Sequence, residues 1–410
     1  MALSPALDSP TRGLGVTAPR GFLAGVACAD IRGAGSARPD VALLVSKERA
    51  AAAGVFTRNR VKAAPVVVSQ LHLRRGFARA IVVNSGNANA CTGAQGLADA
   101  LLMVQTTADA VDCSPQEVLV ASTGVIGREL PLERVRQAIL GAGQDLTPEG
   151  GPLAAAAIMT TDTRPKEASC HFQAAGISHR VGGMAKGAGM IHPDMATLLA
   201  FVTTDARLSP LALRGLLGRA VDLSLNTISI DGDTSTNDSC ICLANGAARG
   251  PELTEGSEGL KRLGWALEEV LQALARQVVA DGEGATRTFS VLVRGAETPE
   301  QALAAARTVT SSPLVKSAVH GADPNWGRVL MAVGRSGAEL ALDRCRLSMA
   351  GHLLFAQGRP TEVAPKTVAA ALRRDDVQIE IDLGVGEAQA RALGCDLSSD
   401  YVRINADYST

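Results

Sequence analysis

The chain has 410 residues, of which 46% are hydrophobic and 20% charged, a composition typical of a folded globular protein and not of a disordered one. Lysine and arginine number 40 against 41 aspartate and glutamate, so the sequence lacks the basic excess of a nucleic-acid-binding protein. No apolar run approaches the roughly 18 residues that a membrane span needs. Residues 1–20 carry Pro, Asp, Ser and Thr where a secretory signal needs an apolar core, which predicts a cytoplasmic protein. Residues 1–13 are expected to form a loose tail.

Short segments of strand type alternate with helical ones along the chain. In the first part, strands are predicted at Val41–Ser46, Pro65–Ser69, Ala80–Asn84 and Glu117–Ser122, and helices at Gln95–Val111 and Leu130–Leu140. Gln144–Pro152 is predicted to be a loop between two subregions. In the second part, leucine spacing predicts an amphipathic helix over 257–280, followed by a strand at Thr286–Arg294, a helix at Pro299–Val309 and a strand at Val377–Leu383. This alternation indicates an α/β or α+β protein.

The eight cysteines form no CxxC pair, and disulfides are not expected in a cytoplasmic chain. Cys240 and Cys242 alternate within an apolar segment, which favours two small buried residues on one strand face over a metal site built from CxC alone. The six histidines show no ligand spacing either. No metal is therefore predicted.

Seven segments rich in glycine and small polar residues are set among the apolar elements, at 84–93, 122–127, 160–163, 182–197, 231–239, 281–286 and 321–328. Such loops usually form turns and sometimes form sites, so their number favours an enzyme. Asn84, Asn87 and Asn89 in the first of them have three interpretations. They can bond neighbouring loops, orient a catalytic water, or simply form a turn, because Asn and Gly favour left-handed conformations.

The segment GGMAKGAGMIHPDMAT at 182–197 carries Lys186 but is no P-loop, because Gly187 stands where that motif needs Ser or Thr after the lysine. Its last residue, Thr197, begins an apolar strand predicted over Leu198–Val202. A threonine hydroxyl becomes a nucleophile when the free α-amine of the same residue acts as its base. That arrangement would require cleavage after Ala196. An Ala-Thr step is commonplace, so taken alone it favours an ordinary structural threonine.

These residues resemble the ornithine acetyltransferase family of arginine biosynthesis. The stretch VGGMAKGAGMIHPDMATLLAFVTTDA looks like the family signature. Nine further segments resemble the family in the same order, namely PRGFLAGVACADIR, AGVFTRNRVKAAPV, VVNSGNANACTG, LVASTGVIG, IMTTDTRPK, SIDGDTSTNDS, VADGEGATR, VKSAVHGADPNWGRV and YVRINADYST. The resemblance therefore covers nearly the whole chain.

The resemblance implies a precursor that cleaves itself between Ala196 and Thr197. Residues 1–196 would become an α chain and residues 197–410 a β chain, intertwined with each other and assembled as an α2β2 heterotetramer. The implied fold is a layered α/β sandwich of the type shared with self-processing aminopeptidases, not a Rossmann fold.

The implied activity is acetyl transfer from N2-acetyl-L-ornithine to L-glutamate through an acetyl-Thr197 intermediate, a ping-pong scheme that needs no cofactor. Acetyl-CoA is a further donor that many family members use, and no residue of this sequence decides whether this chain does. By resemblance, the Thr123 hydroxyl and the Gly124 N–H form the oxyanion hole, where a side chain at position 124 would crowd the oxyanion. The implied substrate-binding residues are Thr160, Lys186, Thr197, Glu283, Asn405 and Thr410.

Within the binding set, Lys186 is the expected partner of the substrate carboxylate and Glu283 that of its amino end. The C-terminal segment with Asn405 and Thr410 is expected to fold over the site, and His192 to act as scaffolding. Two other functions stay open from the residues alone. One is an N-terminal-nucleophile aminopeptidase or amidohydrolase, in which water takes the acyl group. The other is a non-catalytic amino-acid-binding protein, which would keep an intact chain.

Overall fold

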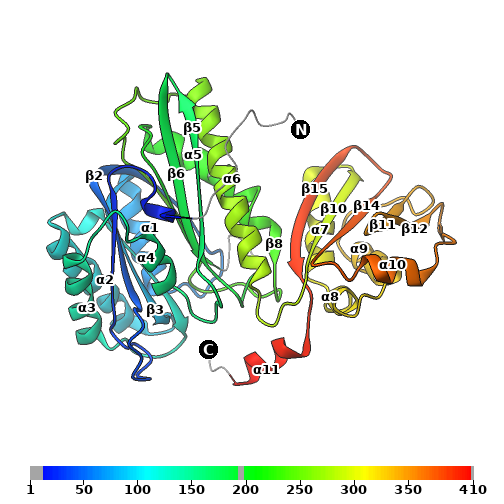
Figure 1. Cartoon of the computed structure of the whole chain (residues 1–410), viewed down its shortest axis with the longest axis horizontal. Helices are drawn as coiled ribbons and strands as arrows, with labels where there is room; N and C mark the ends of the chain where they lie inside the picture. The colour runs from blue at the N-terminus through cyan, green and yellow to red at the C-terminus, as the bar shows by residue number, and fades with distance from the viewer. Residues whose placement is uncertain (1–12, 193–197, 408–410) are drawn as a thin grey trace.

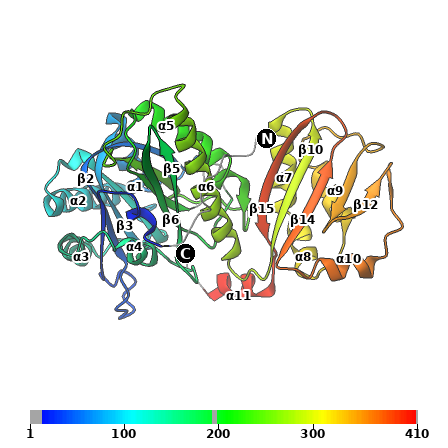
Figure 2. The same cartoon turned by 45° about the horizontal axis from the view of Figure 1, so that its top comes forward.

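The structure, a computed structural model, describes residues 13–192 and 198–407 and has two lobes that lie side by side (Figure 1). The larger lobe is built on an eight-stranded sheet and the smaller on a seven-stranded sheet. The C-terminal helix α11 (Ser399–Asp407) lies below the junction of the lobes in both views (Figures 1 and 2). Within the described residues, none of the helices is long and apolar enough to cross a membrane.

The sheet of the larger lobe has the strand order β4-β3-β2-β9-β7-β6-β5, and β1 pairs with β2 off this path. Most neighbouring pairs are antiparallel, and only β3–β4 and β7–β9 are parallel. This arrangement excludes a Rossmann sheet, which is mainly parallel. The strands are β1 (Phe22–Ala27), β2 (Val41–Phe56), β3 (Phe77–Asn87), β4 (Val118–Val125), β5 (Lys166–Ala174), β6 (Ile177–Lys186), β7 (Leu199–Thr204) and β9 (Ser239–Ala244).

Strand β2 turns this sheet into a two-layered sandwich. Its register with β3 shifts between Val45 and Ala50. Residues 41–46 pair with β1, residues 51–56 pair with β9, and β3 pairs with β2 on both sides of the shift. The two halves enclose one core, which includes Ile81 of one layer and Phe201 of the other. Helices cover both outer faces and give a layered α/β sandwich, as predicted; they are α2 (Gly93–Val111) and α3 (Leu132–Gln144) on one side, and α5 (Pro210–Asp222) and α6 (Glu258–Ala280) on the other.

The smaller lobe packs its helices on one face of the sheet β13-β12-β11-β14-β10-β15-β8. Strand β8 arrives from the larger lobe and pairs with β15, which joins the two lobes. The elements are β8 (Ile228–Ser229), β10 (Thr288–Ala296), α7 (Pro299–Thr310), α8 (Pro313–His320), α9 (Trp326–Gly334), β11 (Arg346–Met349), β12 (His352–Ala356), β13 (Arg359–Pro360), α10 (Pro365–Ala371), β14 (Asp376–Asp382) and β15 (Ala388–Cys395).

Two sequence-based predictions are wrong. Pro65–Ser69 is not a strand but part of helix α1 (Ala64–His72), because proline stands in its first turn and only one face of the valine run is buried. Residues 145–150 of the predicted segment do form a loop, but it joins α3 to helix α4 (Gly151–Ala157) inside the larger lobe and separates no subregions. The chain passes between the lobes later, in residues 281–287.

The remaining predicted elements are present with shifted ends, and the two cysteines of β9 are buried in one core as expected. Strands β6 and β7 form an antiparallel pair that begins at Lys186 and Leu199. The predicted cleavage position lies in the connection between these two residues. In the sheet, the two strands that follow that position in sequence, β7 and β9, therefore lie between β2 and β6, which precede it.

Candidate active site

A cavity of about 450 Å³ opens where the larger lobe, the 281–287 connection and helix α11 meet. Residues from seven separate parts of the chain line it, which explains why no single motif defines the site. Among them are six residues that the sequence predicts at a site, namely Thr123, Gly124, Thr160, Lys186, Glu283 and Asn405. Three further predicted residues, Ala196, Thr197 and Thr410, lie outside the described residues.

Lys186 is the buried cation of this cavity. It ends strand β6, is only 8% exposed, and its Nζ donates to Thr160 Oγ1 at 2.7 Å and to Thr123 Oγ1 at 3.3 Å. Burial lowers the pKa of Lys186, and the negative charge of Asp162 opposes that shift. The lysine and two threonine hydroxyls thus form one hydrogen-bonded cluster facing the cavity.

Gly124 lies at the end of β4, directly opposite Gly86 of β3. Its φ of +133° suits glycine, and a Cβ at this position would approach the Gly86 carbonyl carbon to 2.3 Å and the Asn87 nitrogen to 2.5 Å. The close backbone approach of β3 thus already requires glycine here. This packing reason adds to the crowding of an oxyanion that the sequence suggested.

Glu283 and Asn405 bring the connection between the lobes and helix α11 onto the cavity. Asn405 Nδ2 donates to Glu283 Oε2 at 2.8 Å, and the Glu283 backbone N–H donates to the Ala188 carbonyl at 2.8 Å. The second bond ties the Glu283 loop to the loop that follows Lys186. A carboxylate and an ammonium therefore face the same cavity from opposite segments.

The sequence reasoning missed Asp238, which also lines the cavity and is 1% exposed. The Leu198 backbone N–H donates to its carboxylate, while Oδ2 has no hydrogen-bond partner among the described residues. Burial raises the pKa of Asp238 well above its ordinary value. Asp238 stands in the loop 231–239 that the sequence singles out, but nothing in that pattern distinguishes it from its polar neighbours.

Tyr401 and Asp231 are two other cavity residues that the sequence did not indicate. Their side chains hydrogen-bond to each other, and Asp231 also accepts the Ile191 N–H at 2.8 Å. Burial raises the pKa of both groups. This pair fastens helix α11 to the loop after β6.

The asparagines of 84–93 bond neighbouring loops and turns. Asn87 Nδ2 donates to the carbonyls of Arg128 and Glu129, both at 3.1 Å, and Asn89 adopts a left-handed φ of 47°. His192, the expected scaffolding residue, bonds Ser229 Oγ at 3.0 Å.

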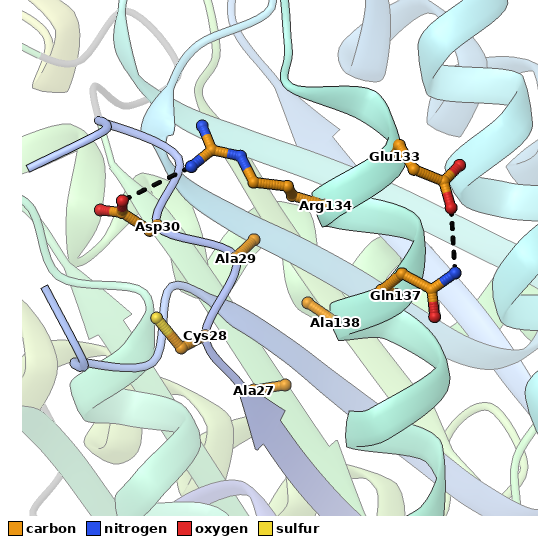
Figure 3. Close-up of a pocket in the computed structure, with 8 residues that line it drawn as sticks. All are labelled: Ala27, Cys28, Ala29, Asp30, Glu133, Arg134, Gln137 and Ala138. Atoms are coloured by element: carbon orange, nitrogen blue, oxygen red, sulfur yellow. Dashed lines mark hydrogen bonds and ion pairs between the residues drawn. The ribbon is translucent and has the colours of Figure 1, made fainter. Parts of the chain in front are cut away.

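A second hollow lies beside α3 and is lined by none of the predicted site residues (Figure 3). Its charged groups already have partners: Arg134 pairs with Asp30 at 3.4 Å, and Glu133 pairs with Arg136 at 2.9 Å and accepts a hydrogen bond from Gln137 Nε2 at 2.9 Å. Within the part of the chain that the structure describes, no group of three or more His, Cys, Asp or Glu residues could hold a metal ion. The cavity around Lys186 is therefore the candidate site.

Known proteins resemble this chain along its whole length. A relative from Symbiobacterium thermophilum, "Arginine biosynthesis bifunctional protein ArgJ", is 50% identical over 396 residues, which cover 97% of this chain and 98% of the relative. A solved protein of the same name from Bacillus halodurans is 39% identical, covers 51% of this chain and 98% of its own, and superposes with a TM-score of 0.50. A solved "Ornithine Acetyltransferase complexed with Ornithine" from Mycobacterium tuberculosis is 40% identical, with coverages of 46% and 98% and a TM-score of 0.42.

The fold and these relatives define the class of the protein, an α/β-sandwich enzyme that is an acyltransferase. The sequence profile of the ArgJ family matches residues 23–410. The chain belongs to the ArgJ family of bifunctional arginine biosynthesis proteins.

Proposed function

We propose that the protein cleaves itself between Ala196 and Thr197 and then transfers the acetyl group of N2-acetyl-L-ornithine to L-glutamate through an acetyl ester on Thr197. The observation that supports this most directly is the cluster of Lys186 with two threonine hydroxyls. It lies in a cavity that is also lined by Leu198, the residue bonded to Thr197. Family membership supplies the reaction type.

In this proposal the Thr197 hydroxyl attacks the acetyl carbonyl, and its free α-amine takes the proton. The Thr123 hydroxyl and the Gly124 N–H would stabilise the oxyanion. Lys186 donates to Thr123 Oγ1, so the hydroxyl hydrogen of Thr123 is left to donate elsewhere. A single oxyanion donor of this kind contributes roughly 10²- to 10³-fold to kcat.

The two half-reactions balance without a cofactor. In the first, the ester bond to Thr197 forms, the amide C–N bond breaks, and ornithine leaves with the proton that the amine held. In the second, the amine of glutamate attacks the ester, the C–O bond breaks, and the proton returns to Thr197. Acetyl-CoA, which many family members also use, is the second donor to be tested in the first half-reaction.

The charges of the cavity match an amino-acid substrate. Lys186 would bind the substrate carboxylate, and Glu283 the amino end, because opposite charges attract strongly in a partly dry cavity. Thr160 and Asn405 already bond to these two side chains and would fix their positions. Thr410 would complete the binding set.

We further propose that the two fragments stay together as an α2β2 assembly in the cytoplasm. The Bacillus halodurans chain supports a division near the middle, because 98% of that chain covers only 51% of this one. Each of the two fragments proposed here would likewise be about half of the protein.

Intact-mass spectrometry tests the proposal. The wild type, Thr197→Ala and Thr197→Ser are compared before and after a pulse of N2-acetyl-L-ornithine, and L-glutamate is then added. We expect two chains that divide at Ala196/Thr197 in the wild type, and one acetyl mass on the β chain that glutamate removes. Thr197→Ser keeps a hydroxyl and should still be cleaved, whereas Thr197→Ala should stay whole.

A single unmodified chain in all three samples would refute the self-cleavage and the nucleophile together. Loss of the acetyl mass in buffer as fast as in glutamate would instead identify a hydrolase of the aminopeptidase type. Omitting N2-acetyl-L-ornithine and adding acetyl-CoA tests the second donor in the same instrument.

A further inference from the structure

A cluster of four buried charges lies directly behind the cavity and includes its cation, Lys186. Lys166 is 0% exposed, and its Nζ lies 2.6 Å from Asp162 Oδ1 and 2.6 Å from Asp281 Oδ2. The Lys186 Nζ lies 3.9 Å from the other oxygen of Asp162. Two lysines and two aspartates therefore form one nearly water-free network with no formal net charge.

Asp162 connects this network to both walls of the cavity. Its Oδ1 accepts the Gly187 backbone N–H at 2.7 Å, next to Lys186, and its Oδ2 accepts the Thr160 N–H at 3.0 Å. Thr160 and Lys186 in turn bond to each other through their side chains. One carboxylate thus fixes the backbone of two cavity residues and faces the charge of one of them.

Asp281 bonds the same lysine but is held differently. Its oxygens accept the N–H of Thr163 at 3.0 Å and the hydroxyl of that residue. Asp281 is as buried as Asp162 and at the same distance from Lys166. The two aspartates therefore differ in their second cation: Asp162 approaches Lys186 of the cavity, whereas Asp281 Oδ1 lies 3.8 Å from Nε of the half-exposed Arg164.

A buried lysine loses its charge unless nearby carboxylates oppose the cost of desolvation. The charged groups that face Lys186 are Asp162, Lys166, Glu283 and Asp238. Asp162 is the strongest of the stabilising charges, whereas Lys166 repels Lys186. Asp238 contributes less, because burial raises its own pKa and so favours its neutral form. Glu283 is the proposed partner of the substrate amine.

We propose that Asp162 is a positioning residue that keeps Lys186 ionised and directs it, together with Thr160, toward the substrate carboxylate. Lys166 bonds Asp162 from behind. This inference rests on the proposed function, in which Lys186 binds that carboxylate. Its test therefore includes a measurement that does not depend on catalysis.

Asp162→Asn and Asp281→Asn form a matched pair of variants. Each replaces one buried carboxylate at 2.6 Å from Lys166 with an amide of the same shape. The first measurement is trace labelling of Lys186 with an amine-reactive reagent across about pH 6 to 10, read by peptide mass spectrometry, because only the neutral amine reacts. We expect a labelling midpoint at least one pH unit lower in Asp162→Asn, and a wild-type midpoint in Asp281→Asn.

The second measurement is the KM for N2-acetyl-L-ornithine over the same pH range. At a pH above the labelling midpoint of Lys186, each pH unit by which that midpoint falls makes the ionised fraction of Lys186 about tenfold smaller. Asp162→Asn should therefore show a KM that rises about tenfold or more between neutral and alkaline pH, while Asp281→Asn keeps the wild-type profile.

Charge-neutral double variants keep the test decisive if Asp162→Asn fails to fold. Lys166→Met with Asp162→Asn and Lys166→Met with Asp281→Asn each remove one buried ion pair, a change that is often tolerated. Only the first of them should lower the labelling midpoint of Lys186.

Equal midpoints in the two variants of a pair, lowered or not, would overturn the inference, because Asp162 would then be no more than a structural ion-pair partner. An inactive wild type would count against the proposed function alone. The labelling difference would in that case still decide the role of Asp162.

Discussion

Gly189→Ala is predicted to displace Glu283 without unfolding the protein. Gly189 lies in the loop after Lys186 and has no positive φ, so its backbone accepts a side chain. A Cβ built there would stand 2.4 Å from Glu283 Oε2 and 2.6 Å from Oε1. Because the obstacle is the end of a flexible side chain, the carboxylate will move and the backbone will not.

The size of the effect follows from these distances. Relief of the overlap needs a shift of about 1 Å, since carbon and oxygen in contact are separated by roughly 3.4 Å or more. Such a shift stretches the 2.8 Å bond from Asn405 beyond hydrogen-bond range. The same shift also moves the carboxylate away from the substrate amine that it is proposed to bind. Loss of that hydrogen bond to a charged group would cost about 1.5–3 kcal/mol of binding, which corresponds to a KM roughly 10- to 100-fold higher.

Steady-state kinetics with N2-acetyl-L-ornithine, together with thermal unfolding, measures this prediction. Gly218→Ala in helix α5 is the matched control, because a Cβ there meets nothing within 4 Å. The control should keep its KM and gain up to about 1 kcal/mol of stability, as alanine favours a helix. An unchanged KM in a folded Gly189→Ala enzyme would show that Glu283 does not bind the substrate.

Three further predictions concern thiols, acid stability and the core. Cys28 and Cys91 are exposed and should react with a thiol reagent in the native protein. Cys240 is buried, which raises its pKa to about 12, and it should react only after unfolding. Labelling of Cys240 in the native protein would contradict its burial. Burial alone would raise the pKa of Asp162, but Lys186 and Lys166 lower it from 3.8 to about 2. The stability that Asp162 contributes is therefore present above about pH 4 and lost toward pH 2. In urea unfolding at decreasing pH, the double variant Lys166→Met, Asp162→Asn should lose less free energy of unfolding than the wild type does. Phe201→Ala, at a position that is 0% exposed, should lower the free energy of unfolding by about 3–5 kcal/mol in urea, and a loss below about 1 kcal/mol would contradict the two-layer core.

Local patterns predicted much of the secondary structure because they depend on neighbours in sequence. The leucine spacing of 257–280 gives helix α6, whose buried face is that stripe. The valine run of α1 was misread because its β-branched residues favour strands locally, while the packing of one face decided for a helix. The bend of β2 and the strand order result from pairings between distant segments, which periodicity does not encode.

The candidate site was predictable where residue type and resemblance coincide, as at Lys186 and Glu283. Asp162 and Asp238 are different, because only burial and their partners distinguish them from the aspartates of ordinary turns. A sequence shows that a loop is polar but not which of its carboxylates loses water on folding. Those two residues therefore required the tertiary structure.

The proposed cleavage falls at a position where the fold tolerates a break in the chain. It falls in the connection between β6 and β7, whose paired ends at Lys186 and Leu199 are already neighbours in the sheet. Cutting that connection would break no strand pairing, since β6 would still bond β7 and β2 would still bond β9. The core between the two layers contains Ile81 from one fragment and Phe201 from the other, so separation would expose apolar surface on both. The cut would free the α-amine of Thr197, whose bonded neighbour Leu198 lines the cavity, while the sheet holds the rest of the site in place.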